Sequence, residues 1–333
     1  MRVTIDTSHI RAVLKLSKAE SVSFIATATN TKIVAQELDE IAGIKNQITK
    51  KVYSGEGEQG KTVISRRILN LLPLGEVIIT DTELTIGTRN ITYVANKEVA
   101  TVIEPLPYRI LQIPSPEFKQ GLNCAYARAT DESRPVLQGL CIDNKDFVSL
   151  DGYRLAIRKS NWEAKEQLVL SPNLVSILKK AKFEGIVNIY ADSNYAEIKD
   201  GNLSIVGKRM EGRYVSYKSL IPVESTTEAV LKAELLINIL KFYKKADIEI
   251  VTLKIEDAKL TVKGNNSEAT IEDSIEVTTK GKEIQISFNI IYLIEALKNY
   301  DDIATLKLTG SVSPLVIEAE GKLELVLPVR MVK

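Results

Sequence analysis

Apolar and polar positions along residues 167–185 predict a short strand followed by an amphipathic helix. The strand-like run QLVL ends at Ser171, whose hydroxyl can cap a helix, and Pro172 is tolerated in a first helical turn. One face of this helix is apolar, formed by Leu174, Ile177, Leu178 and Ala181. Three lysines lie largely off that face, namely Lys179, Lys180 and Lys182, and no carboxylate interrupts residues 171–183. The segment is therefore predicted to be a helix with an apolar back and a basic outer side.

The same strand–helix unit occurs three times with matching order and spacing. The apolar positions Val3, Ile5 and Ile10 correspond, with the same intervals, to Leu111, Ile113 and Phe118. The helix that contains Ile10 corresponds in the same way to one with Leu236, Ile239, Leu240, Lys241 and Lys244. A second unit recurs as well, because a strand-like run leads into Ser65, Ser171 or Ser287 and then into a helix. Internal repeats of this kind predict three similar domains.

Short runs with alternating apolar and polar residues predict antiparallel strands between the helices. They cover residues 22–53, 62–65, 76–95, 138–157, 186–207 and 248–279, with further strands towards residue 333. The proline-rich segment 104–114 marks a domain boundary, and residues 212–222 end the second round of the repeat, where a round is one full set of the repeated strands and helices. We expect an α+β fold of three repeated domains, at 1–107, 108–223 and 224–333, each with two helices packed on antiparallel sheets.

Positive charge is concentrated on the six predicted helices, at 9–18, 64–73, 115–128, 171–183, 232–246 and 289–300. They carry 15 lysines and arginines against three carboxylates, whereas the whole chain has a net charge of +1. Exposed helix faces are often lysine-rich without a function, but one shared basic surface would attract a phosphate backbone. The pattern favours sequence-independent DNA binding. The predicted DNA-contacting residues are Arg11, Lys15, Lys18, Arg66, Arg67, Lys119, Arg128, Arg134, Lys179, Lys180, Lys182, Lys241, Lys244 and Lys245.

The composition indicates a soluble globular protein, with 44% hydrophobic and 26% charged residues. The N-terminal segment lacks a signal-peptide core, and no apolar run approaches the roughly 18 residues of a membrane span, so we expect a cytoplasmic location. Cys124 and Cys141 have no metal-ligand spacing and are predicted to be buried free thiols rather than a disulfide. His9 is the only histidine, which leaves few catalytic constellations. We expect no enzymatic activity, no cofactor and no metal site.

Residues Gly55–Thr62 match the phosphate-loop pattern G-x-x-x-x-G-K-[ST] in full. A nucleotide hydrolase using Lys61 and Asp81 is therefore an alternative. A phosphate loop feeds directly into a helix, whereas β-branched residues follow Lys61 here. Two glutamates would also lie beside the polyphosphate. A glycine-rich hairpin loop is the favoured interpretation.

Several segments carry a family resemblance. ATDESRPVLQGLCI (129–142) precedes VSLDGYRLAIRKS (148–160), and GRYVSYKSLIP occupies 212–222. EIQISFNIIYLIEAL, LTGSVSPLVIE and LVLPVRM follow in the C-terminal part. In content and order they resemble the bacterial DNA polymerase III beta subunit, the sliding clamp. The resemblance covers residues 111–333, and residues 1–105 match mainly in pattern.

The resemblance implies a head-to-tail homodimer whose six domains form a ring, with twelve helices around duplex DNA. A heterologous contact that closes by rotation gives a ring rather than a filament. The implied protein is a non-enzymatic processivity factor that tethers the replicative DNA polymerase and also meets its clamp loader. Its implied partners are duplex DNA, these proteins and a second copy, and no membrane. A repeat-built interaction scaffold that never encircles DNA is a further alternative.

The resemblance also implies a pocket for short hydrophobic peptides between the second and third domains. Its matching residues are Leu137, Gly152, Tyr153, Arg154, Leu155, Val215, Leu220, Tyr292, Val312, Pro314, Val326, Leu327, Pro328, Val329, Arg330 and Met331. Aliphatic walls, tyrosines and arginines suit an apolar peptide with polar backbone atoms. The chain departs from the family pattern at Leu150, at Tyr153, where the family has histidine, and at Pro314, where many members have serine.

Overall fold

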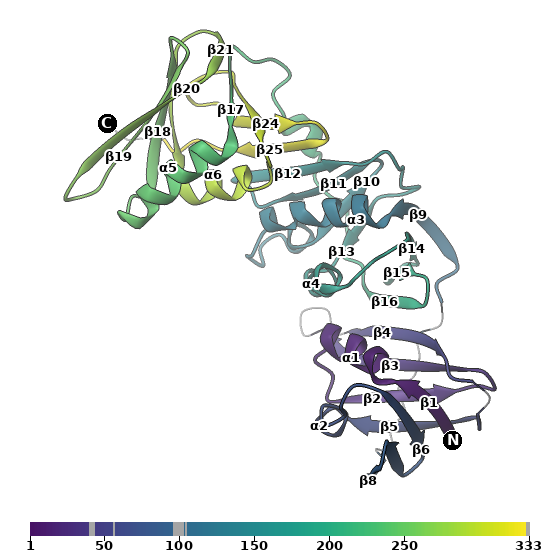
Figure 1. Cartoon of the computed structure of the whole chain (residues 1–333). Helices are drawn as coiled ribbons and strands as arrows, with labels where there is room; N and C mark the ends of the chain where they lie inside the picture. The colour runs from purple at the N-terminus through teal and green to yellow at the C-terminus, as the bar shows by residue number, and fades with distance from the viewer. Residues whose placement is uncertain (40–43, 56, 96–102, 104, 331–333) are drawn as a thin grey trace. The chain divides into compact units, whose positions relative to one another are not determined.

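A computed structural model of the whole chain describes all residues except 40–43, 56, 96–102, 104 and 331–333 (Figure 1). It comprises two compact units. Unit 1 contains residues Met1–Leu122 and Trp162–Glu211, and unit 2 contains Asn123–Asn161 and Gly212–Lys333. Each unit is described by itself.

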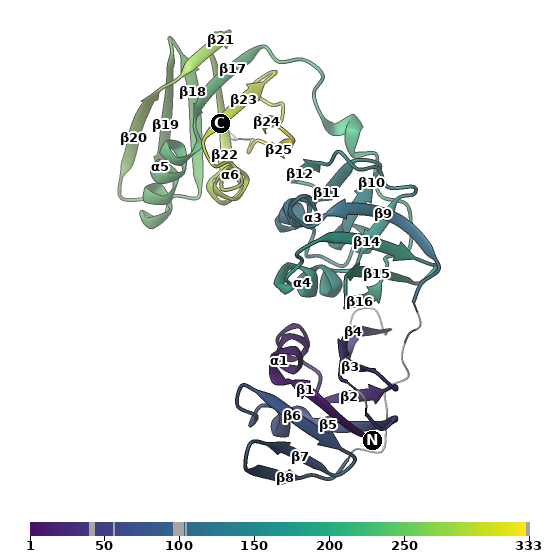
Figure 2. The same cartoon turned by 45° about the vertical axis from the view of Figure 1, so that its right-hand side comes forward.

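One order of elements, strand–helix–four strands–helix–three strands, recurs along the chain (Figure 2). The first round is β1 (Arg2–Asp6), α1 (Thr7–Leu16), β2 (Ser21–Ala26), β3 (Asn30–Asp39), β4 (Ile44–Tyr53), β5 (Gly60–Ser65), α2 (Arg66–Leu69), β6 (Glu76–Thr80), β7 (Glu83–Ile86) and β8 (Arg89–Thr92). The second is β9 (Tyr108–Pro114), α3 (Ser115–Leu122), β10 (Leu140–Asp143), β11 (Asp146–Leu150), β12 (Arg154–Lys159), β13 (Leu168–Leu170), α4 (Pro172–Lys180), β14 (Ile186–Ala191), β15 (Tyr195–Asp200) and β16 (Leu203–Lys208).

The third round has one additional short strand, β21. It is β17 (Thr227–Lys232), α5 (Ala233–Lys245), β18 (Ile250–Glu256), β19 (Lys259–Asn265), β20 (Thr270–Glu276), β21 (Thr278–Gly281), β22 (Ile284–Asn289), α6 (Ile290–Leu297), β23 (Ile303–Leu308), β24 (Leu315–Ala319) and β25 (Lys322–Val326). Short 3₁₀ helices also occur at Asn123–Ala127 (η1), Pro135–Gln138 (η2) and Tyr217–Leu220 (η3). The predicted α+β fold of three repeated domains is confirmed.

The first helices of the three rounds begin at Thr7, Ser115 and Ala233, which keep the spacing that the repeat predicts. The backbone N–H of each first residue donates to a carbonyl from the second half of the same round. The acceptors are Gly75, Gly185 and Asp302, at 2.9, 2.9 and 2.8 Å. The same backbone contact thus fixes the start of each helix, although the residues around it differ.

The second helices begin after side-chain caps. Ser171 caps α4 as predicted, and Ser65 caps α2 in the same way, because each accepts the N–H group of the third residue of its helix. In the third round the cap is Asn289, whose Oδ1 accepts the N–H groups of the first turn of α6. Ser287 lies within β22, two residues before that cap, because β22 runs on to Asn289. Pro172 opens α4, where a missing N–H costs nothing.

α2 and α3 are the most shortened of the predicted helices. α3 ends at Leu122 and continues as η1 rather than as an α-helix over 115–128, because Gly121 lowers the helix propensity of its last turn. α2 consists of Arg66–Leu69 and gives way to turns before Pro73. The strand predictions hold in each round.

In unit 1, one antiparallel sheet runs through both rounds of elements. Its order is β5-β2-β3-β4-β16-β15-β14-β9, and a four-stranded sheet, β1-β6-β7-β8, accompanies it. The junction is the pairing of β4 with β16, where Ile48 lies opposite Ile205. In unit 2, the corresponding junction pairs β12 with β25, and β20-β19-β18-β22 form a separate four-stranded sheet. The last strand of one repeat therefore extends a sheet of the repeat before it.

The phosphate-loop alternative at Gly55–Thr62 is wrong. Gly60–Ser65 is a strand paired with β2, so no helix follows the glycine-rich loop. The Thr62 hydroxyl, which would bind magnesium, is buried and lies 2.9 Å from the hydroxyl of Tyr93. Glu56, within the motif, lies outside the described residues.

The cores are built from the predicted apolar positions, including Ile10, Phe118 and Leu236 at 0–1% exposure. Cys124 and Cys141 are both buried and free, as predicted. Burial raises the pKa of the Cys141 thiol well above its usual range, which keeps it protonated. Among the described helices, none has the length and apolar character needed to cross a membrane.

Candidate functional site

The residues predicted for the peptide pocket all belong to unit 2, and several of them lie where β12 pairs with β25. Arg154 and Val326 face each other across this pairing. Where the chain leaves β25, the Leu327 N–H donates to the carbonyl of Tyr153, at 2.8 Å. The backbone therefore brings the turn at 152–155 together with the C-terminal segment, two parts of the prediction that are far apart in the sequence.

Arg154 makes several contacts at this junction. Its Nε donates to Asp151 Oδ2 at 2.8 Å, and its Nη1 forms an ion pair with Glu295 of α6. Its guanidinium carbon lies 4.7 Å from the ring centre of Tyr292 and 5.5 Å from that of Tyr126. Two carboxylates and two aromatic faces thus hold the guanidinium in one position.

Tyr153 and Tyr292 form an aromatic surface beside Arg154. Their ring centres are 6.1 Å apart with an interplanar angle of 28°, and the Tyr153 side chain remains 61% exposed. The turn that presents Tyr153 contains Gly152 at φ +94°, a conformation that glycine adopts without strain. The tyrosine that replaces the family histidine therefore presents an exposed, stacked ring.

A buried polar cluster lies at the same junction and was missed from the sequence. Arg158 of β12 and Glu324 of β25 are 1% and 0% exposed and form an ion pair. The Tyr126 hydroxyl donates to the other oxygen of Glu324. Burial raises the pKa of the Glu324 carboxyl to about 7, although Arg158 and Tyr126 oppose the shift. Nothing in the sequence links these side chains, because β25 is paired with β12 only in the fold.

The remaining predicted pocket residues divide by exposure. Three apolar side chains are exposed, namely Val215 at 37%, Leu220 at 48% and Val312 at 67%. Three further apolar side chains are buried, namely Leu137, Leu155 and Val326. The half-buried members are Tyr292, Pro314, Leu327, Pro328 and Val329, and Arg330 is exposed. Met331 lies outside the described residues.

Four of the predicted DNA-contacting residues donate to backbone carbonyls. The Arg66 guanidinium binds the carbonyls of Leu14 and Ser17 at the end of α1, at 2.8 and 2.7 Å. Arg11, Lys119 and Arg128 donate to the carbonyls of Leu72, Phe183 and Ala125, at 2.7, 3.1 and 2.9 Å. These side chains contribute to helix ends, where cations are favoured.

A second group of the predicted cations lines one cavity of unit 1. Arg11 and Lys15 of α1 meet Lys180 of α4 and Lys182 around a volume of about 570 Å³. Lys50 of β4 and His9 also line it and were not predicted. The sequence gives no signal for Lys50, since it belongs to a strand and reaches the helices only through the β4–β16 junction.

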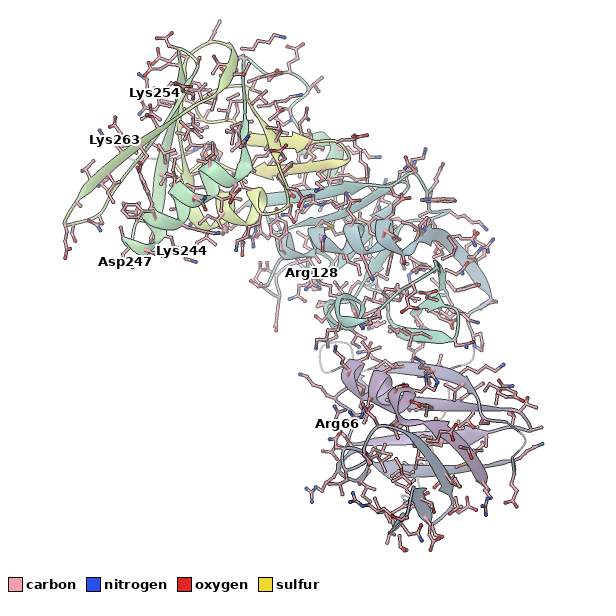
Figure 3. All side chains as sticks on the ribbon, viewed as in Figure 1. Arg66, Arg128, Lys244, Asp247, Lys254 and Lys263 are labelled. Carbon is pink, nitrogen blue, oxygen red and sulfur yellow. The ribbon has the colours of Figure 1, made fainter. Side chains whose placement is uncertain are left out.

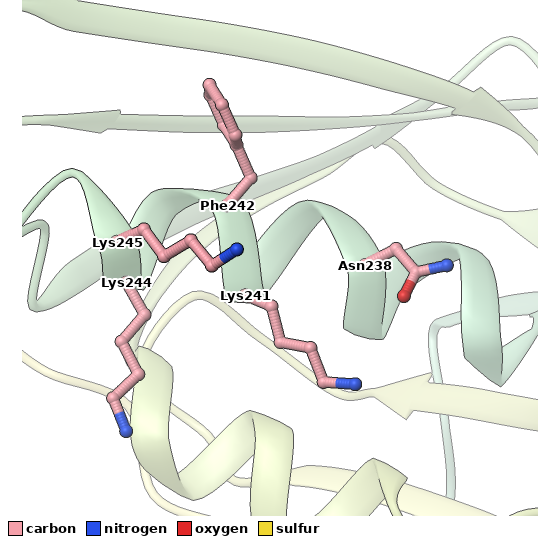
Figure 4. Close-up of a pocket in the computed structure, with 5 residues that line it drawn as sticks. All are labelled: Asn238, Lys241, Phe242, Lys244 and Lys245. Carbon is pink, nitrogen blue, oxygen red and sulfur yellow. The ribbon is translucent and has the colours of Figure 1, made fainter.

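A third group lies on α5 in unit 2. Lys241, Lys244 and Lys245 line a shallow cavity of about 500 Å³ with Asn238 and Phe242 (Figure 4). Phe242 points away from the helix on the side opposite Lys244 and is 57% exposed. An exposed phenylalanine among lysines is an unusual surface for an isolated helix.

Two cations on the neighbouring strands, Lys254 of β18 and Lys263 of β19, are labelled in Figure 3. Lys254 forms an ion pair with Glu283 at 3.0 Å, and Lys263 forms one with Glu272 at 3.2 Å. The ion pairs of the described residues include none of the three α5 lysines. Positive charge is therefore concentrated on the helix.

Three comparisons with known proteins agree with this fold. Residues 218–330 match the family model of the DNA polymerase III beta subunit, C-terminal domain. The beta sliding clamp of Bacillus subtilis is 26% identical over 252 residues, which cover 67% of this chain and 65% of the relative. That of Buchnera aphidicola subsp. Rhopalosiphum padi is 30% identical over 219 residues, covering 59% of this chain and 57% of the relative. The sequence matches thus span less than two thirds of these relatives.

The structural similarity extends over the whole chain. The crystal structure of the DNA polymerase sliding clamp from Bacillus subtilis aligns with a TM-score of 0.87 at 22% identity, covering 100% of both chains. That of the sliding clamp from Bartonella birtlesii bound to griselimycin has a TM-score of 0.85 at 19% identity and covers 99% of this chain and 100% of the other. The fold is that of the sliding clamps. By sequence, the chain is similar to the bacterial DNA polymerase III beta subunit, most clearly over residues 218–330, which match the model of that family's C-terminal domain.

Proposed function

We propose that this chain is a DNA sliding clamp, a non-enzymatic processivity factor that encircles duplex DNA and tethers a DNA polymerase. The observation that carries the proposal is the threefold repeat, with basic helices in each round and junctions that extend a sheet from one round to the next. The names of the relatives give the same function. We retain domain boundaries at 1–107, 108–223 and 224–333, and a cytoplasmic, nucleoid-associated location.

The basic helices are the proposed DNA-facing surface. Lysines on α4 and α5 are attached to helices with buried apolar faces, so their charges have a fixed backbone position. Contacts of this kind bind phosphates without reading bases. A protein that is linked topologically to DNA needs only such weak contacts, because it is retained while it slides.

A head-to-tail dimer follows from the junctions inside the chain. β4 of the first round pairs with β16, the last strand of the second round, and β12 of the second round pairs with β25, the last strand of the third. In both cases the pairing strand is the third one after the first helix of its round. The equivalent strand of the third round is β20, and the last strand of the first round is β8. Each lies at an edge of its four-stranded sheet in the described residues. By the same rule, β20 pairs with β8 of a second copy.

Charge and apolar exposure support this contact. β20 carries Glu272, Asp273 and Glu276, whereas β8 carries Arg89. Phe242 occupies the same position in α5 as Leu16 does in α1, counted from the first residue of each helix. Leu16 is 8% exposed and lines the cavity between α1 and α4 of the next round, but Phe242 is 57% exposed. We propose that the second helix of another copy covers Phe242.

The junction of β12 and β25 is the proposed peptide site. Arg154 and Tyr153 lie at this junction with Tyr292, and unit 2 also exposes three apolar side chains of the proposed site, namely Val215, Leu220 and Val312. This combination suits a short hydrophobic segment of a polymerase or of the clamp loader.

Retention on DNA tests the proposal. The protein should remain on nicked circular duplex DNA at a salt concentration that removes ordinary DNA-binding proteins, and it should be lost when the circle is cut. Loading can be achieved with a clamp loader from a relative. Equal retention on circular and linear DNA, or no retention on either, would contradict encirclement and favour the scaffold alternative. Light scattering should give twice the chain mass of 36.9 kDa.

A further inference from the structure

Tyr126 of η1 contacts two charged groups, one through its ring and one through its hydroxyl. The hydroxyl donates to the carboxylate of Glu324, and the guanidinium carbon of Arg154 lies 5.5 Å from the centre of the ring. The tyrosine itself is half-buried. One side chain therefore connects an arginine of the proposed peptide site with a carboxylate that is 0% exposed.

The hydroxyl of Tyr126 is held in place by the buried ion pair of unit 2. Glu324 accepts from Arg158 with Oε1 and from Tyr126 with Oε2, so each carboxylate oxygen has a partner from another part of the chain. Arg158 is fixed in turn, because its Nη1 donates to the carbonyl of Ile157 at 2.7 Å. If Tyr126 turned away, a buried acceptor would lose its donor, which is unfavourable where water cannot replace it. The position of the ring is thus determined from inside the protein.

The ring of Tyr126 limits the position of Arg154. The guanidinium carbon also lies 4.7 Å from the ring centre of Tyr292, and cations are attracted to aromatic faces within about 6 Å. Its Nε and Nη1 donate to Asp151 and Glu295. In the described part of the chain no hydrogen bond of Nη2 is found, so this nitrogen can donate to a carbonyl of a bound peptide.

We propose that Tyr126 is a positioning residue of the peptide site, and that the ionised Glu324 carboxylate controls, through the Tyr126 hydroxyl, how firmly Arg154 is held. The inference rests on the proposed peptide site and adds regulation to it. Neither Tyr126 nor Glu324 needs to touch the peptide, because both act through the guanidinium of Arg154.

The charge of Glu324 changes near neutral pH. The groups that face it are Arg158 of β12, Tyr126 of η1, Lys322 of β25 and Tyr300, which follows α6. Burial is the largest influence and raises the pKa of the Glu324 carboxyl to about 7, although the two cations and the Tyr126 hydroxyl oppose the shift. A carboxylate accepts a stronger hydrogen bond than a neutral carboxyl. Tyr126 is therefore held more firmly when Glu324 is ionised, and peptide affinity should rise as the pH increases through this pKa.

The test is isothermal titration calorimetry of the full-length protein. The ligand is the hydrophobic clamp-binding segment of a relative's replicative DNA polymerase, made as a peptide with blocked ends and no histidine. The affinity of the wild-type protein should rise about threefold between about pH 6 and pH 8. Tyr126→Phe keeps the ring without the hydroxyl, and Glu324→Gln stays neutral, so both variants should have a flat pH profile. Tyr126→Leu loses the ring as well and should bind about fivefold more weakly at about pH 8.

Tyr243→Phe is the matched control. Tyr243 of α5 is a buried tyrosine whose hydroxyl donates to the carbonyl of Val262 at 2.8 Å. The variant loses a buried hydrogen bond of the same donor and should be less stable, but its peptide affinity and pH profile should equal those of the wild type. A purely structural role of Tyr126 predicts this same result for Tyr126→Phe, and that result would overturn the inference.

Failure of the inference differs from failure of the peptide site. If Val312→Asp weakens peptide binding while the wild type, Tyr126→Phe and Glu324→Gln share one pH profile, the site stands and the inference is wrong. If the wild-type protein binds no peptide at either pH, both are wrong. If Tyr126→Leu does not fold, the pH profiles of Tyr126→Phe and Glu324→Gln decide the outcome.

Discussion

At the scale of single residues, the sequence predicted the burial and chemical state of side chains better than the groups that they contact. Cys124 and Cys141 are buried and form no disulfide, as predicted from their number and spacing. The DNA contact of Arg66 stays a prediction, whereas the hydrogen bonds of its guanidinium to carbonyls at the end of α1 were not predicted. Hydrogen bonds between residues far apart in the sequence depend on the fold, and no local sequence pattern predicts them. The ion pair of Arg158 and Glu324 was missed for the same reason.

Glu324 should make the stability of unit 2 depend on pH. Its pKa is about 7 in the fold against an ordinary value of 4.5, because it is buried. A raised pKa means that its contribution to stability is complete below about pH 4.5 and is lost as the pH rises through about 7. Relative to Glu324→Gln, the free energy of unfolding of the wild-type protein should therefore fall across this pH window.

Urea unfolding at several pH values measures this difference. The exposed Glu320→Gln variant is the control and should follow the wild-type profile. Parallel profiles for the wild type and Glu324→Gln would mean that the carboxyl is ionised throughout this range.

Val312 tests the proposed peptide site. It is 67% exposed beside Pro314, and a carboxylate there would be desolvated by an apolar peptide. We expect Val312→Asp to weaken the binding of a hydrophobic clamp-binding peptide by about tenfold, or about 1.4 kcal/mol, in fluorescence anisotropy. Val223→Asp, at a 99% exposed position, is the control and should bind normally. Equal affinity of both variants would remove Val312 from the site.

At the scale of elements, the repeat predicted the spacing of the first helices correctly. This spacing holds because each of these helices begins at the same backbone contact. The repeat did not predict the cap of α6, because β22 runs two residues beyond Ser287 and ends at Asn289. Strand ends depend on pairing with β18, which the local sequence does not encode.

The cap of α6 gives a prediction at this scale. Asn289→Ala should lower the free energy of unfolding by about 1 kcal/mol, because two N–H groups lose their acceptor. Asn289→Gly should cost only a few tenths of a kcal/mol, since glycine also suits this position. Chemical denaturation measures both. A smaller loss for alanine than for glycine would contradict the assigned cap.

At the scale of the whole molecule, charge segregation predicted where the cations gather but not the cavity between α1 and α4. That cavity also needs Lys50 from a strand and the β4–β16 junction. The proposed peptide site likewise needs two segments that meet only at the β12–β25 junction. Both sites depend on sheet continuity between repeats, and this was not part of the sequence pattern.

Phe242 provides the prediction for assembly. If a second copy covers this side chain, Phe242→Asp should raise the dimer dissociation constant by at least about a hundredfold, or about 2.7 kcal/mol, because a charge would be buried. Sedimentation equilibrium measures the constant, with Val223→Asp again as the control. A dimer of unchanged affinity would show that Phe242 lies outside the interface.

The pairings β4–β16 and β12–β25 have a consequence for the lifetime of the assembly. Both join parts of one covalent chain, so their closure does not depend on protein concentration. The proposed β20–β8 contact joins two chains and obeys mass action. Dilution would therefore act on this contact alone, and the residence time of the clamp on a closed circle would be set by how fast these two edge strands separate.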